Sequence, residues 1–132
     1  MAITQAMSTL FKKDVLLGDH HLDSDNIYIA LYTSSEVANG NGYTTGGNAL
    51  ASKAVTENST SGVFDAADPE WTSATFTARG ALIYNKSLGD TTSNANGAIA
   101  ILDFGGDFSV SGGTFRIVFP AATKDTAIVR ID

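Results

Sequence analysis

The second half of the chain consists of four apolar segments separated by turn-forming residues. They cover residues 76–85 (FTARGALIYN), 97–105 (GAIAILDFG), 114–120 (TFRIVFP) and 127–131 (AIVRI). Segments of this length that are rich in Ile, Val and Phe and are bounded by Gly, Asn, Asp and Ser are typical of buried antiparallel strands. We therefore expect this half of the chain to form a sheet.

In the first half of the chain, the spacing of the apolar residues changes from helical to strand-like. Apolar residues between Thr4 and Leu17 recur mostly at steps of three and four, which predicts a helix that ends at Gly18. A polar connector, DHHLDSDN, follows, and strict alternation in residues 27–32 then predicts a strand. Weaker patterns indicate short strands near residues 50–56 and 62–64. The change of period predicts a helix that precedes a sheet.

Together these segments predict a mainly β fold with six to eight strands. We expect one domain over residues 1–132, with an N-terminal helix in residues 1–18 and an antiparallel β-sandwich or jelly-roll-like unit in residues 26–132. A chain of 132 residues is long enough to bury a core without metals or disulfides.

Glycine-rich and polar segments predict the loops. Residues 34–48 contain four glycines and are long enough for a surface loop, in which Tyr43 is expected to be exposed. Residues 89–96 are expected to form an exposed hairpin loop, and GGDFSVSGG is expected to form a turn between two strands.

Alternation also predicts which faces of the strands are buried. In residues 76–85 the face with Phe76, Ala78, Gly80, Leu82 and Tyr84 is the better core candidate. In the last two strands the opposite faces each combine an apolar residue with an arginine: Arg116 with Val118, and Arg130 with Ile128. This pattern indicates a surface that is partly covered by the helix or by another subunit.

Charge and composition limit the partners. The net charge is −6, and the eight Lys and Arg residues form no cluster, so we expect no nucleic-acid partner. No apolar run approaches the roughly 20 residues that cross a bilayer, and the N-terminus lacks the pattern of a signal peptide, so we expect no membrane association. The absence of cysteine excludes disulfides, thiolate metal sites and a cysteine nucleophile.

Candidate chemistry is sparse. Asp19, His20, His21, Asp23 and Asp25 form the densest group of possible metal ligands, but their spacing does not match an EF-hand loop, and a local turn explains the segment better.

Asp103 and Asp107 could form a glycosidase-like pair, although turn-forming roles explain them better. A GxSxG motif and a phosphate-binding loop are both absent. We therefore expect no enzyme activity, no cofactor and no metal.

Several longer motifs carry a resemblance to a known family. They are FKKDVLLGDHHLDSDNIYIALYTSS, GYTTGGNAL, FTARGALIYN and AIAILDFGGDFSVSGGTFRIVFP, followed by AIVRI. Over nearly its whole length the chain resembles small virion structural proteins of tailed bacteriophages, notably marine and cyanobacterial ones. The resemblance implies a short helix before the strand at residues 27–32 and a central hairpin formed by RGALIYN and LDFGG. It implies no catalytic residue.

The expected function is therefore structural. We expect a capsid decoration or cement protein, located in the virion after assembly in the host cytoplasm, that binds the major capsid protein or other virion proteins and forms a homo-oligomer. The candidate interface residues are Met7, Leu10, Phe11, Tyr43, Arg79, Arg116, Val118, Ile128 and Arg130. The three arginines are candidates for contact with an acidic neighbour.

Two alternatives remain at this point. A tail-associated adaptor or receptor-binding protein would contact the host surface through the loops at residues 34–48 and 89–96. A carbohydrate-degrading enzyme would need an acid and a base that the sequence does not identify.

Overall fold

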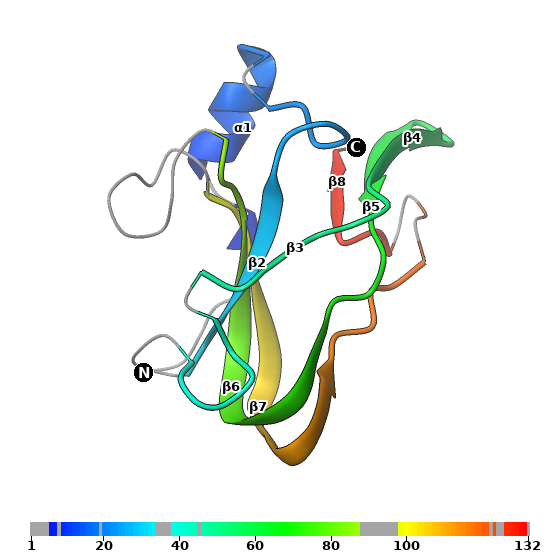
Figure 1. Ribbon diagram of the computed structural model, residues 1–132. Coiled ribbons are helices and arrows are strands. Elements are labelled where there is room, and N and C mark those ends of the chain that lie inside the picture. Colours follow the sequence, from blue (N-terminus) through cyan, green and yellow to red (C-terminus); the bar gives the residue numbers. More distant parts are fainter. Residues whose placement is uncertain are drawn as a thin grey trace.

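The computed structural model describes residues 6–7, 9–18, 20–33, 38–44, 46–87, 98–121, 123 and 126–131 (Figure 1). Its elements are β1 (Ala6–Met7), α1 (Thr9–Leu16), β2 (Ile27–Tyr32), β3 (Asn48–Ala49), β4 (Ala54–Asn58), β5 (Ser61–Asp65), β6 (Glu70–Asn85), β7 (Ala98–Arg116) and β8 (Val129–Ile131). The prediction of a mainly β fold with one short helix is confirmed.

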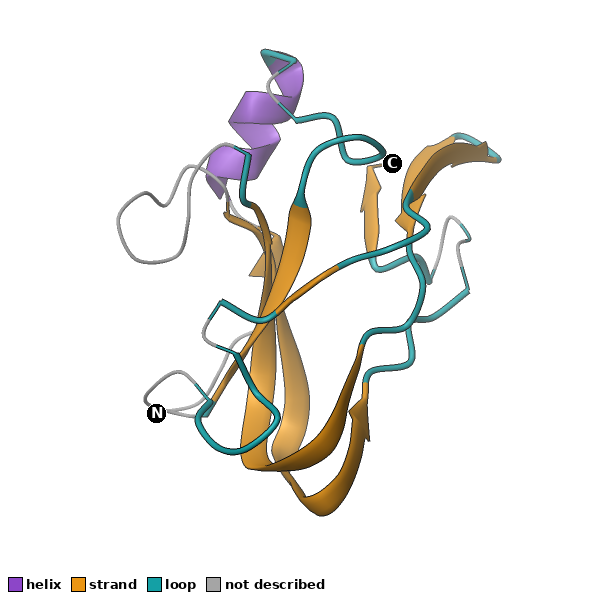
Figure 2. Ribbon diagram, in the orientation of Figure 1, coloured by secondary structure: helices purple, strands orange, loops and turns teal. Residues whose placement is uncertain are grey.

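The strands form two antiparallel sheets. The larger has the order β1-β7-β6-β2-β3, and the smaller has the order β4-β5-β8. The smaller sheet lies beside the end of the larger sheet that carries α1, while β6 and β7 continue beyond it and curl at the far end (Figure 2). This arrangement is a small sandwich-like fold in which one sheet covers only part of the other.

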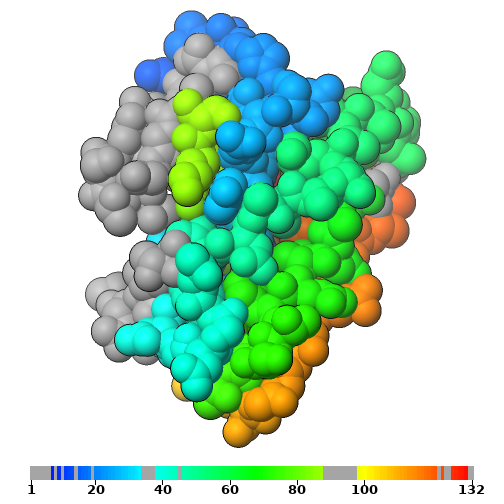
Figure 3. All heavy atoms as spheres, in the orientation of Figure 1, coloured from blue at the N-terminus to red at the C-terminus, as the bar shows by residue number. Residues whose placement is uncertain are grey.

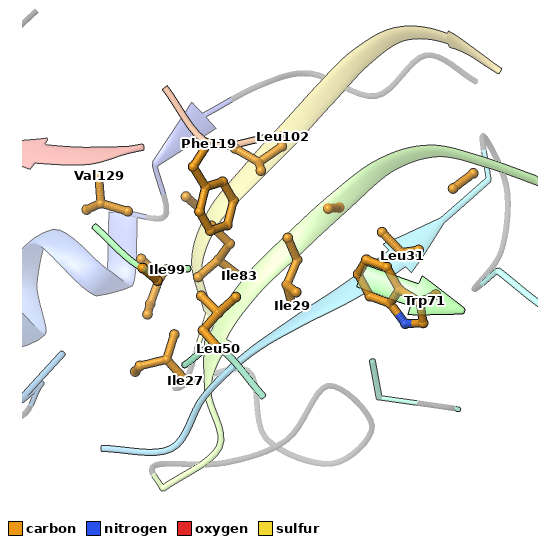
Figure 4. Packing of buried hydrophobic residues seen from close by; sticks show 14 of the residues in the cluster. Ile27, Ile29, Leu31, Leu50, Trp71, Ile83, Ile99, Leu102, Phe119 and Val129 are labelled. Carbon is orange, nitrogen blue, oxygen red and sulfur yellow. The ribbon is translucent and has the colours of Figure 1, made fainter. Parts of the chain in front are cut away.

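The core lies between the sheets and draws on α1, β2, β5, β6, β7 and β8. Ile27 and Ile29 of β2, Ile83 of β6 and Ile99 of β7 are at most 1% exposed, and Val129 of β8 joins them from the smaller sheet (Figure 4). Full burial of one such side chain stabilises the fold by about 1.5–3 kcal/mol. The two sheets therefore share one hydrophobic cluster.

Residues 98–116 form one strand, which corrects the prediction of a turn at GGDFSVSGG. Ala78 pairs with Phe108 and Gly80 with Asp103, so residues 104–107 bulge out of the ladder opposite Arg79. A second irregularity places Gly112 out of register. Gly105 and Gly112 have φ values of 81° and 64°, which glycine adopts without the steric cost of a Cβ atom. The glycines thus bend a continuous strand and do not end it.

Beyond the first of these bulges, β6 is buried on both faces. Phe76, Ala78, Gly80 and Tyr84 are buried as predicted, but Ala81 and Ile83 of the opposite face are buried as well. Ile83, predicted to face outward, is fully buried, whereas Leu82 is only half-buried. The predicted core face is therefore correct for Phe76, Ala78, Gly80 and Tyr84 and wrong for Leu82.

The N-terminal helix is shorter than predicted. Ala6 and Met7 pair with Ile101 and Ala100 as strand β1, and the helix begins only at Thr9. The end of the helix is as predicted, because the Gly18 amide donates to the Val15 carbonyl at 3.1 Å and Gly18 has a φ of 77°. Ala6 and Met7 therefore form an edge strand on β7 and are not part of the helix.

Candidate interaction surfaces

The predicted interface on the N-terminal helix is wrong for Phe11. Its side chain is 1% exposed and its ring packs edge-on against the ring of His20, with centroids 4.8 Å apart. The side chain of Leu10 lies outside the described residues. The exposed apolar surface of this element is instead formed by Leu16 and Leu17, which are 88% and 65% exposed.

Met7, Ile128 and Arg130 come together, although they lie far apart in the sequence. They line a hollow of about 360 Å³ between the β1–β7 edge and the segment that leads into β8; its other lining residues are Ala100, Ile101, Leu102, Pro120, Thr126 and Ala127. Met7 and Ile128 are half-buried, and Arg130 is exposed. We call this hollow the edge groove; it combines an apolar floor with a guanidinium group.

Arg116 and Val118 line a second hollow of about 460 Å³ at the far end of β7, together with Phe104, Phe108, Ser109, Val110, Thr114, Phe115 and Ile117. Phe108 is 53% exposed and Val118 is 71% exposed. Arg116 forms ion pairs with Asp68 at 3.2 Å and Glu70 at 3.5 Å beside this hollow. We call it the distal groove.

Phe108 is a surface residue that the sequence analysis missed. It lies within GGDFSVSGG, whose glycines predict a turn. The spacing of Phe108 and Val110 within a strand would have placed both on one face. Cross-strand register puts them beside Ala78 and Phe76, on the face that elsewhere carries the core.

Tyr43 is half-buried, which corrects the prediction that it is exposed. Its ring lies 5.6 Å from the ring of Phe76, and its hydroxyl oxygen accepts a hydrogen bond of 2.9 Å from the Leu31 amide. Burial raises the pKa of Tyr43 above its ordinary value, although the hydrogen bond from Leu31 acts in the opposite direction. Tyr43 therefore anchors its loop to the sheet.

The same loop closes one edge of the larger sheet. The Ala38 amide donates to the Leu31 carbonyl at 2.9 Å, and Asn41 forms a β-bridge with Thr75 of β6. In Figure 3 the cyan segment lies against green β6. A Cβ atom on Gly47 would collide with the Ile29 carbonyl oxygen, so the backbone here packs directly on β2. The described part of the loop covers the sheet.

Arg79, Asp103 and Asp107 are engaged within the first bulge of β7. Arg79 pairs with Asp107 at 3.2 Å, and an oxygen of Asp103 accepts a hydrogen bond of 2.9 Å from the Gly105 amide. These contacts fix the backbone where residues 104–107 leave the ladder. The two carboxylates therefore have structural roles in a bulge, in place of the predicted roles in a turn.

The connector before β2 is organised by a buried amide. Asn85 is 0% exposed; its Nδ2 lies 2.7 Å from Oδ2 of Asp25 and 3.2 Å from Nδ1 of His20. The Asp25 carboxylate also accepts a hydrogen bond of 2.9 Å from the His21 amide. These bonds hold the connector in a turn against the end of β6.

The environment of Asp25 shifts its acidity. Burial alone raises the pKa of Asp25, but the hydrogen bonds from Asn85 and the His21 amide, together with the nearby histidine rings, lower it below 3.8 on balance. Asp19 lies outside the described residues. Within the described ranges, no three His, Cys, Asp or Glu side chains are grouped so that they could hold a metal ion.

Comparisons with protein-family models, curated proteins and solved structures find no match to this chain. In the described part of the chain, no helix has the length and apolar character needed to cross a membrane. The fold and the two grooves are therefore the structural basis for a functional interpretation.

Proposed function

We propose that this chain is a virion structural protein of a tailed bacteriophage, and that it decorates the assembled head by binding the major capsid protein. The proposal combines the resemblance of its sequence motifs with one structural observation. The edge groove exposes apolar side chains beside Arg130 even though the domain already has a complete core. Ile101, for example, is 41% exposed there.

An apolar floor with a guanidinium group at its rim suits a protein partner. Arginine presents five donors in a fixed plane and binds carboxylates through two parallel hydrogen bonds. Exposed apolar groups beside it gain free energy when a partner removes them from water. We therefore assign the edge groove to the shell, with an acidic residue of the capsid protein opposite Arg130.

Decoration requires only a modest interface. A protein that binds the assembled shell and not its free subunits stabilises the shell by mass action, and many identical copies multiply the effect. A small domain with a rigid core is suited to this role because its binding surface is preorganised. No catalytic step is part of the proposal.

The number of copies in the particle tests this proposal. Quantitative mass spectrometry of purified particles should give on the order of a hundred copies or more, because a decoration protein follows the lattice of the head. A tail ring would contain roughly a dozen to a few dozen copies, since its closed symmetry fixes the number. A low count, or absence from the particle, would refute head decoration.

Variants then test the surface. Ile101→Asp should weaken binding of the purified protein to undecorated shells, because it places a charge in the edge groove. Leu16→Asp, at an 88% exposed position at the end of α1 and outside the edge groove, is the matched control and should bind like the unmodified protein. Equal binding of both variants would show that the shell contacts a different surface.

A further inference from the structure

The loop between β2 and β3 contains the dipeptide Asn-Gly twice in succession. Asn39-Gly40 is followed directly by Asn41-Gly42, and all four residues are exposed on the surface (Figure 3). Within the described residues, neither asparagine side chain and neither glycine amide makes a hydrogen bond. Asparagine is a thermally labile residue, and a following glycine has no side chain to shield its nitrogen. The loop therefore presents two chemically equivalent reactive pairs.

The fold holds the second pair firmly. The Tyr43 amide donates to the Gly40 carbonyl at 3.3 Å and closes a β-turn with Asn41 and Gly42 at its centre. Gly42 has a φ of 82°, which is typical of the third residue of a type II turn. The Asn41 carbonyl also accepts a hydrogen bond of 2.9 Å from the Thr75 amide of β6. The peptide between Asn41 and Gly42 cannot turn without breaking this bond.

The first pair lies outside the turn. Its neighbours are anchored, because the Ala38 amide bonds to the Leu31 carbonyl and Gly40 packs on β6. A Cβ atom at Gly40 would collide with the Thr75 carbonyl oxygen, so this packing requires glycine. The peptide that joins Asn39 to Gly40 makes no hydrogen bond to any described residue. This peptide can therefore turn without the loss of a bond.

We propose that Asn39 is a site of spontaneous covalent modification in the folded chain. The Gly40 nitrogen attacks Cγ of Asn39, its proton passes to solvent, and the side-chain nitrogen leaves as ammonia. Water then opens the resulting five-membered imide at either carbonyl, which leaves aspartate or isoaspartate at position 39. The net reaction consumes one water and releases one ammonia, and it needs no oxidant or reductant.

The modification changes the loop that closes the β2 side of the larger sheet. Isoaspartate adds one carbon atom to the backbone between Ala38 and Gly40, both of which are fixed to the sheet. Either product also adds one negative charge to a chain whose net charge is already −6. The longer backbone no longer fits between its two anchors. We therefore expect the modified chain to be less stable than the unmodified one.

The reaction rates of the two pairs test the proposal. The full chain is incubated at mildly alkaline pH, folded or in urea, and fragment-ion mass spectrometry follows residues 39 and 41 separately. In the folded chain Asn41 should react roughly two- to tenfold more slowly than Asn39, the ratio that corresponds to one net hydrogen bond. In urea the two rates should become equal. Equal rates in the folded chain, or an unchanged ratio in urea, would overturn the proposal.

Matched variants test the effect on the loop. Asn39→Gln keeps an amide at this position, but its longer side chain must close a six-membered ring and reacts more slowly. On incubation, the urea midpoint should fall for the unmodified chain and for the control Asn41→Gln, and should fall less for Asn39→Gln. Equal falls in all three would refute the effect on the loop. The isolated chain is used throughout, so the outcome does not depend on the proposed capsid binding.

Discussion

At the scale of single residues, Asn85 is the buried polar residue that links the connector before β2 to the end of β6. Its Oδ1 accepts a hydrogen bond of 3.0 Å from the Ser87 amide, while its Nδ2 donates to Asp25. Lys86 and Asn26 add a backbone bond of 2.8 Å nearby. A buried amide with partners on both sides ties the connector to the end of β6, because any unpaired polar atom there would carry a desolvation cost.

Asp25 makes this network sensitive to acid. Because its pKa in the folded chain lies below the ordinary value of 3.8, the charged form contributes stability above that pH. This contribution is lost as the pH falls through the lower, folded-state pKa. Asp25→Asn should lower the free energy of unfolding at neutral pH by about 1.5–3 kcal/mol, the typical value of a hydrogen bond to a charged group.

Urea denaturation at several pH values tests the assignment. The difference in stability between the unmodified chain and Asp25→Asn should persist from neutral to mildly acidic pH and should shrink below about pH 4. Asp23→Asn, at an exposed position in the same connector, is the control and should differ little from the unmodified chain. A difference in the free energy of unfolding that stays the same down to low pH would contradict the role of the carboxylate charge.

At the scale of elements, the sequence predicted the strands well and the bulges poorly. Alternation located β2 and most of β6, because side chains of a half-buried strand must alternate between core and solvent. Gly105 and Gly112 predict a turn where the structure has bulges, because a glycine with positive φ serves equally in a turn and in a bulge. Only the partner strand decides between the two, and local sequence does not contain that information.

The candidate surface residues show the same contrast between local patterns, which the sequence reveals, and long-range contacts, which it does not. Val118, Ile128 and the nearby arginines were identified from apolar residues on outward faces, and the structure places all of them at grooves. Phe11 was misassigned because a helical stripe does not reveal whether it faces the core of its own chain. Tyr43 was misassigned because its burial depends on a long-range contact with Leu31.

Two glycines test how tightly the elements are packed. Gly47 and Gly112 both have positive φ values, of 82° and 64°. A Cβ atom at Gly47 would collide with the Ile29 carbonyl, whereas one at Gly112 would meet no atom within 4 Å. Gly112→Ala should therefore lower the free energy of unfolding by about 1–2 kcal/mol, because the only penalty is to place a Cβ atom in the left-handed conformation. Gly47→Ala should lower the free energy of unfolding by more, about 3 kcal/mol or above, because the loop must also move away from the backbone of β2.

Chemical denaturation of the two variants separates these costs. Gly112→Ala reports the cost of the backbone conformation, so the excess loss in Gly47→Ala measures the packing of the loop on the sheet. Equal losses would show that the loop moves away from β2 at little cost. That result would also weaken the view that this edge of the sheet is closed.

At the scale of the whole molecule, the edge groove and the distal groove lie apart. The edge groove lies between β1 and β8, whereas the distal groove lies at the far end of β7. A capsid subunit bound at the edge groove would therefore leave the distal groove exposed.

The shared core predicts that the two sheets unfold together. Trp71, the single tryptophan, is 2% exposed in the half of the larger sheet that extends beyond the smaller one, yet it belongs to the same cluster as Val129 of β8. Urea transitions followed by tryptophan fluorescence and by far-ultraviolet circular dichroism should therefore coincide in midpoint and slope, as expected for a cooperative domain of this size. An earlier fluorescence transition would show that the distal ribbon opens first. Such independent opening would show that the core shared by the two sheets does not unfold as one cooperative unit.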